Sequence, residues 1–538
     1  METHGDTAVA REVPPGEQAA RLVASVDQDE WGAVRPSLYE TARVVSYAPW
    51  LTGDERRIAY LLDEQADDGS WGEGAETYRL VPTLSAVEAL LSVARRRTAS
   101  AELSARVCAA AARGLGALRR LPGNGPWPDT AAAEILVPAL VARIREHLAS
   151  PESAGSEHLG PWHRGPALPV PGGYHAEAPQ YVAAKYAAVG ELPVKFHHTF
   201  EGLGARLVDA LVPDPGSLSC LLGSSPAATA AWADRSSPAA ARPGDRVPGP
   251  GVLSSPAVRE LREVGRRYGH LFPEAAPITV FERLWVAAAL SRAGLLDGAG
   301  RWAARGWVER IWDAAGVRGA PGLMIDADDT AMAVLTAARL GLPFGPEPLA
   351  LFHNGTHYDC YLGEDTGSVT ANAHALQALT AAEGRDPGSA VAERASLADW
   401  LVSVQQPDGL WPDKWHASPY YATERTVTAL AGHGGAHAEA AVARAVSRVV
   451  AEQRDDGSWG VWGGTAEETA YAVKILLRAD APDGPALARA GAYLDAVCAP
   501  GAEHRHPPLW HDKTLYAPLA MIEAEVLSAR HLLGQRHG

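Results

Sequence analysis

The sequence QRDDGSW, residues 453–459, decides the fold, because its pattern Gln-x-x-Asp-Gly-x-Trp recurs along the chain. The pattern reads QADDGSW from residue 65 and QQPDGLW from residue 405. The copies at 405 and 453 start 48 residues apart, about the length of a helical hairpin with its loop. Asp-Gly favours a tight turn, and the flanking Gln and Trp can tie that turn to the next hairpin. The repeats therefore predict stacked helical hairpins that close into a barrel or solenoid, and they favour a structural role for these Gln and Trp residues.

The rest of the chain also predicts helices. Residues 101–121, 131–148 and 388–405 carry apolar side chains at helical spacing and are rich in Ala, Leu, Arg and Glu. Alternating β-branched and polar residues are scarce, so we expect an all-α protein. Residues 212–255 are rich in Pro, Gly and Ser, which predicts a long connection with an inter-domain crossing at its far end.

Composition narrows the class of protein. The 538 residues are enough for two or three domains, and 47% of them are hydrophobic without an apolar run of membrane-spanning length. The balance of 48 Lys and Arg against 64 Asp and Glu gives a net charge of −16, which argues against a nucleic-acid partner. The four cysteines form no Cys-x-x-Cys pair, and the N-terminus lacks a basic patch followed by an apolar stretch. We therefore expect a cytoplasmic protein without a transmembrane segment.

The stretch MIDADDTAMAV, residues 324–334, places Asp326, Asp328 and Asp329 before an apolar, helix-like run. Crowded, buried carboxylates raise one another's proton affinity, so such a cluster can hold a proton at neutral pH and act as an acid. The alternatives are a calcium loop and a solvated helix N-terminus. A calcium loop would need a Gly at its sixth position, and this stretch runs into apolar residues instead, which favours the acid.

The repeats and the Asp-x-Asp-Asp-Thr-Ala motif together resemble the class II terpene cyclases, which include squalene-hopene cyclases and copalyl diphosphate synthases. DEWGAVRPSLYETARVV at 29–45, SSPAATAA, VFERLWV, WPDKWHASPYYAT and LWHDKTLYAP extend the resemblance to the diterpene branch, over residues 29–520. The resemblance implies two double-layered (α/α) helical barrels, the γβ architecture. Residues 1–48 would pack with the β barrel, 49–270 would form the γ domain, and 271–538 the β domain that carries the acidic motif.

Class II cyclisation begins when an acid protonates a carbon–carbon double bond. The resemblance implies that Asp328 is the donor, supported by Asp326 and Asp329. His374 stands where the family places a hydrogen-bonding partner of the acid, near Asn372.

The reaction ends with loss of a proton from a carbocation. His198 matches the histidine that holds the terminating water in plant ent-copalyl diphosphate synthases, but their asparagine falls on Glu274, which leaves the terminating base open.

The cavity should be aromatic, because π faces stabilise cations while water is excluded. The expected binding residues are aromatic side chains for the hydrocarbon and basic ones for the diphosphate: Trp285, Trp415, Tyr420, Lys414, Lys513 and Arg79. Trp411 and Tyr421 are further aromatic candidates. Mg²⁺ usually accompanies the diphosphate in this family, and Glu134 matches a recurrent family glutamate.

The resemblance implies protonation-initiated cyclisation of geranylgeranyl diphosphate to a bicyclic copalyl-type diphosphate. Cyclisation of farnesyl diphosphate to a drimenyl-type product, a squalene-hopene-like reaction and a non-catalytic binding protein remain alternatives. The metal motifs of class I synthases, which ionise the diphosphate, are not found in the sequence. The product is therefore expected to pass to a separate class I synthase or another tailoring enzyme.

Overall fold

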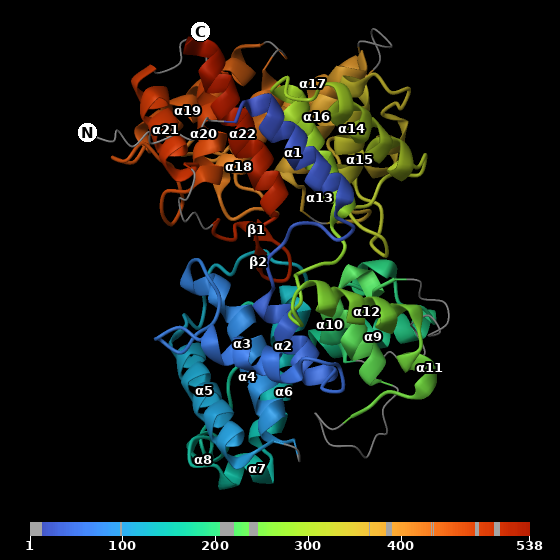
Figure 1. Cartoon of the computed structure of the whole chain (residues 1–538), viewed down its shortest axis with the longest axis vertical. Coiled ribbons are helices and arrows are strands. Elements are labelled where there is room, and N and C mark those ends of the chain that lie inside the picture. The colour runs from blue at the N-terminus through green and yellow to red at the C-terminus, as the bar shows by residue number, and fades with distance from the viewer. Residues whose placement is uncertain are drawn as a thin grey trace, which may run out of the picture.

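The structure is a computed structural model that describes residues 13–96, 99–204, 220–235, 246–364, 366–383, 390–431, 433, 435–478, 484–499 and 506–537. The described residues are mostly helical, as the sequence predicts, and they form two clusters stacked along the long axis of the molecule (Figure 1). We call the cluster of α2 to α12 the lower half, and the cluster of α1 and α13 to α22 the upper half. Within the described ranges, no helix combines the length and apolarity needed to cross a bilayer.

The lower half is built around α4, which contacts α2, α5 and α6. Its helices and short 3₁₀ segments (η) are α2 (Leu38–Tyr47), α3 (Asp54–Asp63), η1 (Glu76–Arg79), α4 (Leu80–Ala94), α5 (Ala101–Arg120), α6 (Ala133–Leu148), α7 (Pro151–Gly155), α8 (Gly160–Arg164), α9 (Ala178–Val189), η2 (Val194–Phe196), η3 (Phe200–Leu203), η6 (Leu222–Ser224), α10 (Pro226–Asp234), α11 (Pro250–Leu253) and α12 (Pro256–Arg267). α4 is buried along nearly its whole length, and its buried Glu88 pairs with Arg43 and Arg143.

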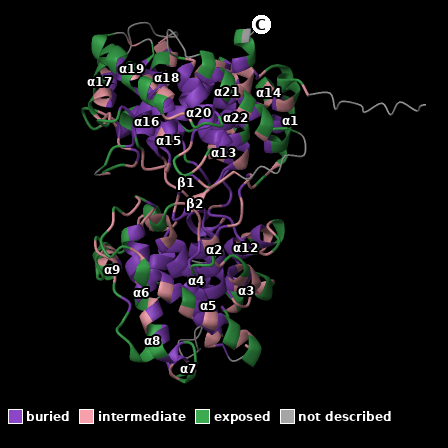
Figure 2. Cartoon of the chain, turned by 90° about the vertical axis from the view of Figure 1, so that its left-hand side faces the viewer, coloured by how far each residue is buried: buried purple, intermediate pink, exposed green. Residues whose placement is uncertain are grey.

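In the upper half, α13, α15, α16, α18, α20 and α22 contact one another in succession, and α13 contacts α22. The elements are α1 (Pro15–Gln28), α13 (Thr279–Arg292), α14 (Gly298–Ile311), α15 (Ala327–Leu340), η7 (Glu347–Phe352), α16 (Val369–Glu383), α17 (Val391–Ser403), α18 (Pro419–Leu430), α19 (Ala436–Ala451), α20 (Ala466–Leu476), α21 (Gly484–Val497), β1 (Trp510–His511), β2 (Leu515–Tyr516) and α22 (Leu519–His537). Figure 2 shows that buried residues fill the centre of each half while exposed residues cover the outer helices.

The three Gln-x-x-Asp-Gly-x-Trp turns make the same hydrogen bonds, so their predicted structural role is confirmed. In the copy at 453, the Gln453 amide donates to the carbonyls of Gly457 (3.0 Å) and Ala486 (2.8 Å). The indole N–H of the fully buried Trp459 donates to Val449 O at 2.7 Å. Gln65 with Trp71 and Gln405 with Trp411 repeat the pattern. The turns thereby tie α3 to α5, α17 to α19 and α19 to α21, in each case skipping the helix between.

Glycine is required in these turns. Gly69, Gly409 and Gly457 have φ values of 84°, 93° and 87°, in the left-handed region. A Cβ atom at Gly457 would also lie 2.5 Å from the carbonyl oxygen of Arg489. Local backbone geometry thus explains why Asp-Gly recurs.

The expected connection at 212–255 is partly helical, because residues 226–234 form the buried helix α10. Its start is encoded locally: Ser225 Oγ accepts the N–H of Ala228, and Pro226 occupies the first turn. Residues 212–219 and 236–245 lie outside the described residues.

The N-terminal segment contacts both halves of the molecule. α1 contacts α13, α14 and α22 in the upper half, whereas α2 contacts α3, α4 and α10 in the lower half. The described part of this segment, residues 13–48, therefore contacts both halves.

The antiparallel hairpin of β1 and β2 lies between the two halves (Figure 1) and pairs Trp510 with Tyr516. Its tip, residues 512–514, reaches the lower half, where Ala131 N–H donates to Asp512 O at 2.9 Å.

Candidate active site

A cavity of about 2030 Å³, counting the open solvent at its mouth, lies where the two halves meet. It is lined by residues of η2, α13, the start of α15, the loop after α17 and the β1–β2 hairpin. Its ionisable and aromatic lining residues are Asp129, Glu134, Lys195, Phe196, His198, Phe281, Trp285, Asp326, Asp328, Asp329, Tyr361, Glu364, Lys414, Trp415, Tyr421, Trp510, His511, Asp512 and Tyr516.

The acidic motif forms the N-terminus of α15. Asp326 is the N-cap, and its Oδ1 accepts the backbone N–H of Asp329 at 2.7 Å. Asp326 and Asp329 are buried, whereas the Asp328 side chain is 13% exposed. All three line the cavity, and Asp328 is the carboxyl group that the cavity reaches most easily.

Burial raises the pKa of two of these carboxyl groups. The pKa of Asp326 lies well above its usual range, because the group is buried and Asp329 is charged beside it. Burial raises the pKa of Asp329 to about 7, with the charge of Asp328 adding to the shift. The cluster therefore retains protons near neutral pH, as the crowding of its residues predicts.

His374 on α16 lies against the acid, as expected, with Nδ1 2.6 Å from Asp328 Oδ1. Its Nε2 is buried and, among the described residues, has no hydrogen-bond partner. Asn372 has a different role: its side chain bonds the backbone N–H and carbonyl of Tyr358. His374 alone of the two therefore contacts the acid.

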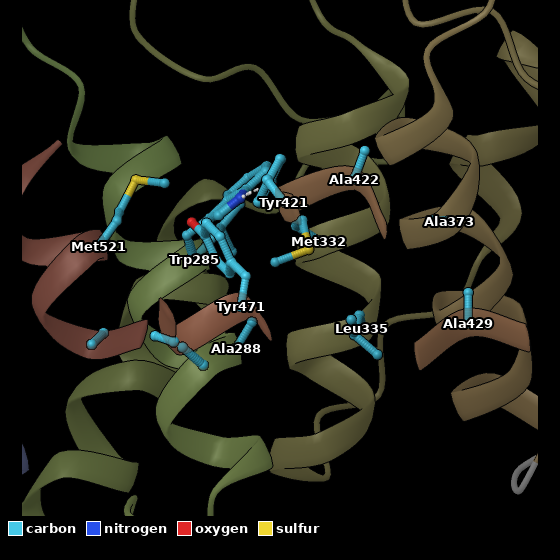
Figure 3. Close-up of a cluster of buried hydrophobic side chains, with 14 of the residues drawn as sticks. Trp285, Ala288, Met332, Leu335, Ala373, Tyr421, Ala422, Ala429, Tyr471 and Met521 are labelled. Carbon is cyan, nitrogen blue, oxygen red and sulfur yellow. Dashed lines mark hydrogen bonds between the residues drawn. The ribbon is translucent and has the colours of Figure 1, made fainter. Parts of the chain in front are cut away.

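An aromatic wall stands beside His374. The Trp285 ring meets the His374 ring edge-on, with centroids 5.4 Å apart, and its indole N–H donates to Tyr421 OH at 2.8 Å. Figure 3 shows Trp285, Tyr421 and Tyr471 gathered beside Met332 of α15. Phe281 extends this wall, with its ring centroid 4.4 Å from that of Trp285. These faces can stabilise a cation and keep water away.

Of the other expected aromatic residues, Trp415 lines the cavity but Tyr420 does not. Tyr420 OH instead donates to Glu452 at 2.8 Å. Consecutive residues of a helix point about 100° apart, so Tyr421 faces the cavity and Tyr420 faces α19. Trp411 is held in its repeat turn.

Charged residues of both signs line the same cavity. Lys414 pairs with Glu364, donates to Thr366 O at 3.2 Å and lies over the Trp415 ring. Lys195, which the sequence reasoning missed, lies over Phe196. Asp129 and Glu134 add two carboxylates. Burial and the charge of Asp129 raise the pKa of Glu134.

The other two expected diphosphate anchors lie elsewhere. Lys513 is fully buried, and its ammonium donates to Glu40 (2.7 Å), Glu201 (2.9 Å) and Ser225 Oγ (2.7 Å). Its three protons are therefore taken, and it is not among the cavity-lining residues. Arg79 pairs with Asp68 at 3.3 Å, also away from the cavity lining.

His198 lines the cavity and contacts a residue that the sequence reasoning did not select. Its Nε2 lies 3.0 and 3.1 Å from the two carboxylate oxygens of Asp512. Glu274 is buried behind this pair and accepts the N–H of Thr514 at 2.7 Å. Asp512 belongs to the LWHDKTLYAP motif, from which the sequence reasoning selected only Lys513.

Such an acid can protonate a double bond, and the aromatic wall can accommodate the resulting cation. A mostly helical protein with this site is a class II terpene cyclase. The similarity of the chain to known proteins leads to the same class. The chain is 58% identical to the copalyl diphosphate synthase of Streptomyces anulatus over 97% of its length and 92% of that protein. The chain belongs to the bacterial copalyl diphosphate synthase family of class II diterpene cyclases.

Two further relatives bear on fold and product. The ent-copalyl diphosphate synthase structure from Streptomyces platensis matches 97% of this chain and 100% of that chain, with a TM-score of 0.86 and 40% identity. The labda-7,13-dienyl diphosphate synthase of Streptomyces clavuligerus is 46% identical over 96% of this chain and 93% of that protein. The squalene-hopene cyclase C-terminal domain family matches residues 362–499. The match to a solved terpene cyclase confirms the expected mostly helical terpene-cyclase fold.

Proposed function

We propose that this enzyme cyclises geranylgeranyl diphosphate to a bicyclic copalyl-type diphosphate and leaves the diphosphate intact. The contact between Asp328 and His374 at the wall of the aromatic cavity carries the proposal. Relatives that cover nearly the whole chain and are named for copalyl diphosphate support the choice of substrate.

The first step is proton transfer from Asp328. The O–H bond of its carboxyl group breaks, and the π electrons of the terminal double bond form a new C–H bond, which leaves a tertiary cation. The next two double bonds then attack in turn and close two rings, and the double bond nearest the diphosphate stays intact. The Nδ1–H of His374 donates a hydrogen bond to Asp328 and so stabilises the carboxylate that forms. Asp326 and Asp329 hold protons that can replace the one Asp328 has lost.

We expect the turnover number to fall as pH rises through about 7. The pKa of Asp329 is about 7 and that of Asp326 is raised well above its usual range, so the cluster holds protons at acidic pH and loses them as pH rises through about 7. If one proton is required, the rate should drop about tenfold per pH unit on the alkaline side. Initial rates at saturating substrate between pH 5.5 and 8.5 check this, and a rate that climbs from pH 7 to 8.5 would contradict it.

We propose that Lys414 and Lys195 hold the diphosphate, and that Asp129 and Glu134 hold Mg²⁺ beside it. Mg²⁺ is commonly bound by one or two carboxylates together with substrate phosphates, and these two side chains line the cavity that the substrate must enter. The metal would neutralise part of the diphosphate charge. Among the described residues, no cluster of three or more acidic, His or Cys ligands forms a metal site by itself.

Replacing Glu134 by Gln should raise the Mg²⁺ concentration for half-maximal activity about tenfold, because one anionic ligand is lost. Activity titrations with Mg²⁺ measure this. The same change at the exposed Glu102 of the lower half is the matched control and should leave the titration unchanged. An unchanged titration for the Glu134 variant would place the metal elsewhere.

The direct test of function is incubation with geranylgeranyl diphosphate, and in parallel with farnesyl diphosphate, followed by mass spectrometry before and after phosphatase treatment. A cyclised C20 product that still carries its diphosphate supports the proposal. A product from the C15 substrate alone would reassign the enzyme to drimenyl-type chemistry. Unchanged diphosphates would favour a squalene-like substrate.

We propose that the two halves correspond to the γ and β barrels of the family, with the lower barrel starting at α2. The repeated hairpins and the match to the Streptomyces platensis structure support this division.

We further propose that the enzyme acts in the cytoplasm, since Cys108, Cys360 and Cys498 keep free thiols. Its product would be passed to a separate class I synthase or another tailoring enzyme.

A further inference from the structure

Cyclisation must end when a base removes a proton from the final carbocation. That base must reach the cavity and must carry a lone pair that no other group occupies. His198 and Asp512 both line the cavity near the tip of the β1–β2 hairpin, and they contact each other. The question is which of the two can accept a proton.

Both ring nitrogens of His198 face acceptors. Nδ1 lies 2.7 Å from the carbonyl oxygen of Gly223, which has no proton to give, so Nδ1 carries a hydrogen. Nε2 lies almost equally far from both Asp512 oxygens, at 3.0 and 3.1 Å. A protonated carboxyl group would make one short bond through its hydroxyl, whereas an N–H shared between two oxygens fits a carboxylate. His198 is therefore an imidazolium without a free lone pair.

Asp512 has unoccupied lone pairs, which His198 lacks. As a carboxylate it has about four lone-pair positions, and the N–H of His198 together with the backbone N–H of Lys513 leaves others unused. Its side chain is 19% exposed and lines the cavity. Burial alone would raise its pKa, but the charge of His198 and the hydrogen bond from it, together with the charge and backbone N–H of Lys513, outweigh burial and lower that pKa. Burial would lower the pKa of His198, but Asp512 raises it above its ordinary value.

The neighbouring carboxyl group, that of Glu274, cannot act as the base in place of Asp512. Glu274 is fully buried, is not among the cavity-lining residues, and bonds Thr514 through its backbone N–H and its hydroxyl. Burial and the negative charge of Asp512 raise the pKa of Glu274 to about 8, so it is mostly protonated at neutral pH. Asp512 is left as the carboxylate that meets the cavity on this wall.

We propose that Asp512 is the base that ends cyclisation and that His198 is its positioning residue; this rests on the proposed function. The C–H bond next to the cationic carbon breaks, its electron pair forms the product double bond, and the proton moves to a carboxylate oxygen of Asp512. His198 keeps the carboxylate ionised and oriented. One proton enters from Asp328 and one leaves to Asp512, so the product is an isomer of the substrate, and exchange with solvent at the open mouth resets both groups.

The test compares Asp512→Asn, Asp512→Glu and His198→Gln with the wild type on geranylgeranyl diphosphate, with products identified after phosphatase treatment. In Asp512→Asn we expect a roughly 10²-fold slower release of the wild-type product and new hydroxylated or differently unsaturated diphosphates, because the cation persists until water or another base meets it. Asp512→Glu keeps a carboxylate and should restore the wild-type double bond. His198→Gln keeps a donor toward Asp512 without a titratable nitrogen, so it should keep the product and lose only rate.

Product identity separates a catalytic role from a structural one, since a weakened fold lowers yield without moving the double bond. If Asp512→Asn does not fold, as judged by circular dichroism, Asp512→Ser replaces it as the neutral variant. The wild-type product at a near wild-type rate from a neutral variant would overturn the proposal, and so would a product changed by His198→Gln but not by Asp512→Asn. A wild-type enzyme that forms no cyclised diphosphate would overturn the proposed function itself, and with it the need for this base.

Discussion

Replacing Asp328 by Asn is expected to abolish cyclisation, with a loss of about 10³-fold or more in turnover. The substitution preserves the size of the side chain and an oxygen that can accept the hydrogen bond from His374, but it removes the proton that starts the reaction. Asp326 and Asp329 are buried, so neither can easily take over the donor's place. Turnover of geranylgeranyl diphosphate, measured by mass spectrometry, gives the loss directly.

The same variant should still bind substrate, because the cavity walls and the basic residues at Lys414 and Lys195 are unchanged. Isothermal titration with geranylgeranyl diphosphate separates this binding from chemistry. Asp399→Asn, an exposed change of the same type on α17, is the matched control and should retain full activity. If Asp328→Asn kept more than about a tenth of wild-type turnover, another member of the cluster would have to be the donor.

Replacing Lys513 by Met should lower the free energy of unfolding by about 3–5 kcal/mol, because it leaves buried carboxylates without their partner. Lys513 lies in the hairpin between the halves, and its ammonium holds Glu40 on α2 and Glu201 on η3. All three side chains are almost completely buried, so water cannot replace the lost interaction. Denaturant unfolding of the variant and the wild type measures the difference.

The size of this loss should depend on pH. Burial raises the pKa of Glu40 to about 7 even with Lys513 present, so in the variant Glu40 can become neutral at low pH but stays an unpaired anion at high pH. The destabilisation should therefore be larger at pH 8 than at pH 5.5. Lys185→Met, at an exposed cation on α9, is the control. A loss below about 1 kcal/mol at both pH values would show that the buried ion pairs contribute little net stability.

The features that the sequence predicted well are those written in a few consecutive residues. A Gln-x-x-Asp-Gly-x-Trp turn satisfies its own backbone groups and requires glycine, so its presence identifies the hairpin wherever it occurs. The acidic motif is likewise local, since Asp326 caps the helix that carries Asp328. These short-range patterns were enough for the helical fold and the acid.

The residues that the sequence could not place depend on contacts across the whole chain. Lys513 was expected to bind the diphosphate, but its partners Glu40 and Glu201 lie 473 and 312 residues away in sequence. Its neighbour Asp512 faces the cavity instead. Two adjacent residues in a hairpin tip point in different directions, and only the position of the lower half decides which one meets substrate.

The packing of α1 sets an order in which the protein can be completed as it leaves the ribosome. The apolar face of α1, with Leu22, Val23 and Val26, packs on α13, α14 and α22, which are made much later. The helices of the lower half have all been made once α12 has emerged, whereas the partners of α1, and Lys513, which pairs with Glu40 and Glu201 in the lower half, come later. α1 is thus made early but buried late, and its apolar face must be kept from unspecific contacts until α22 has been synthesised.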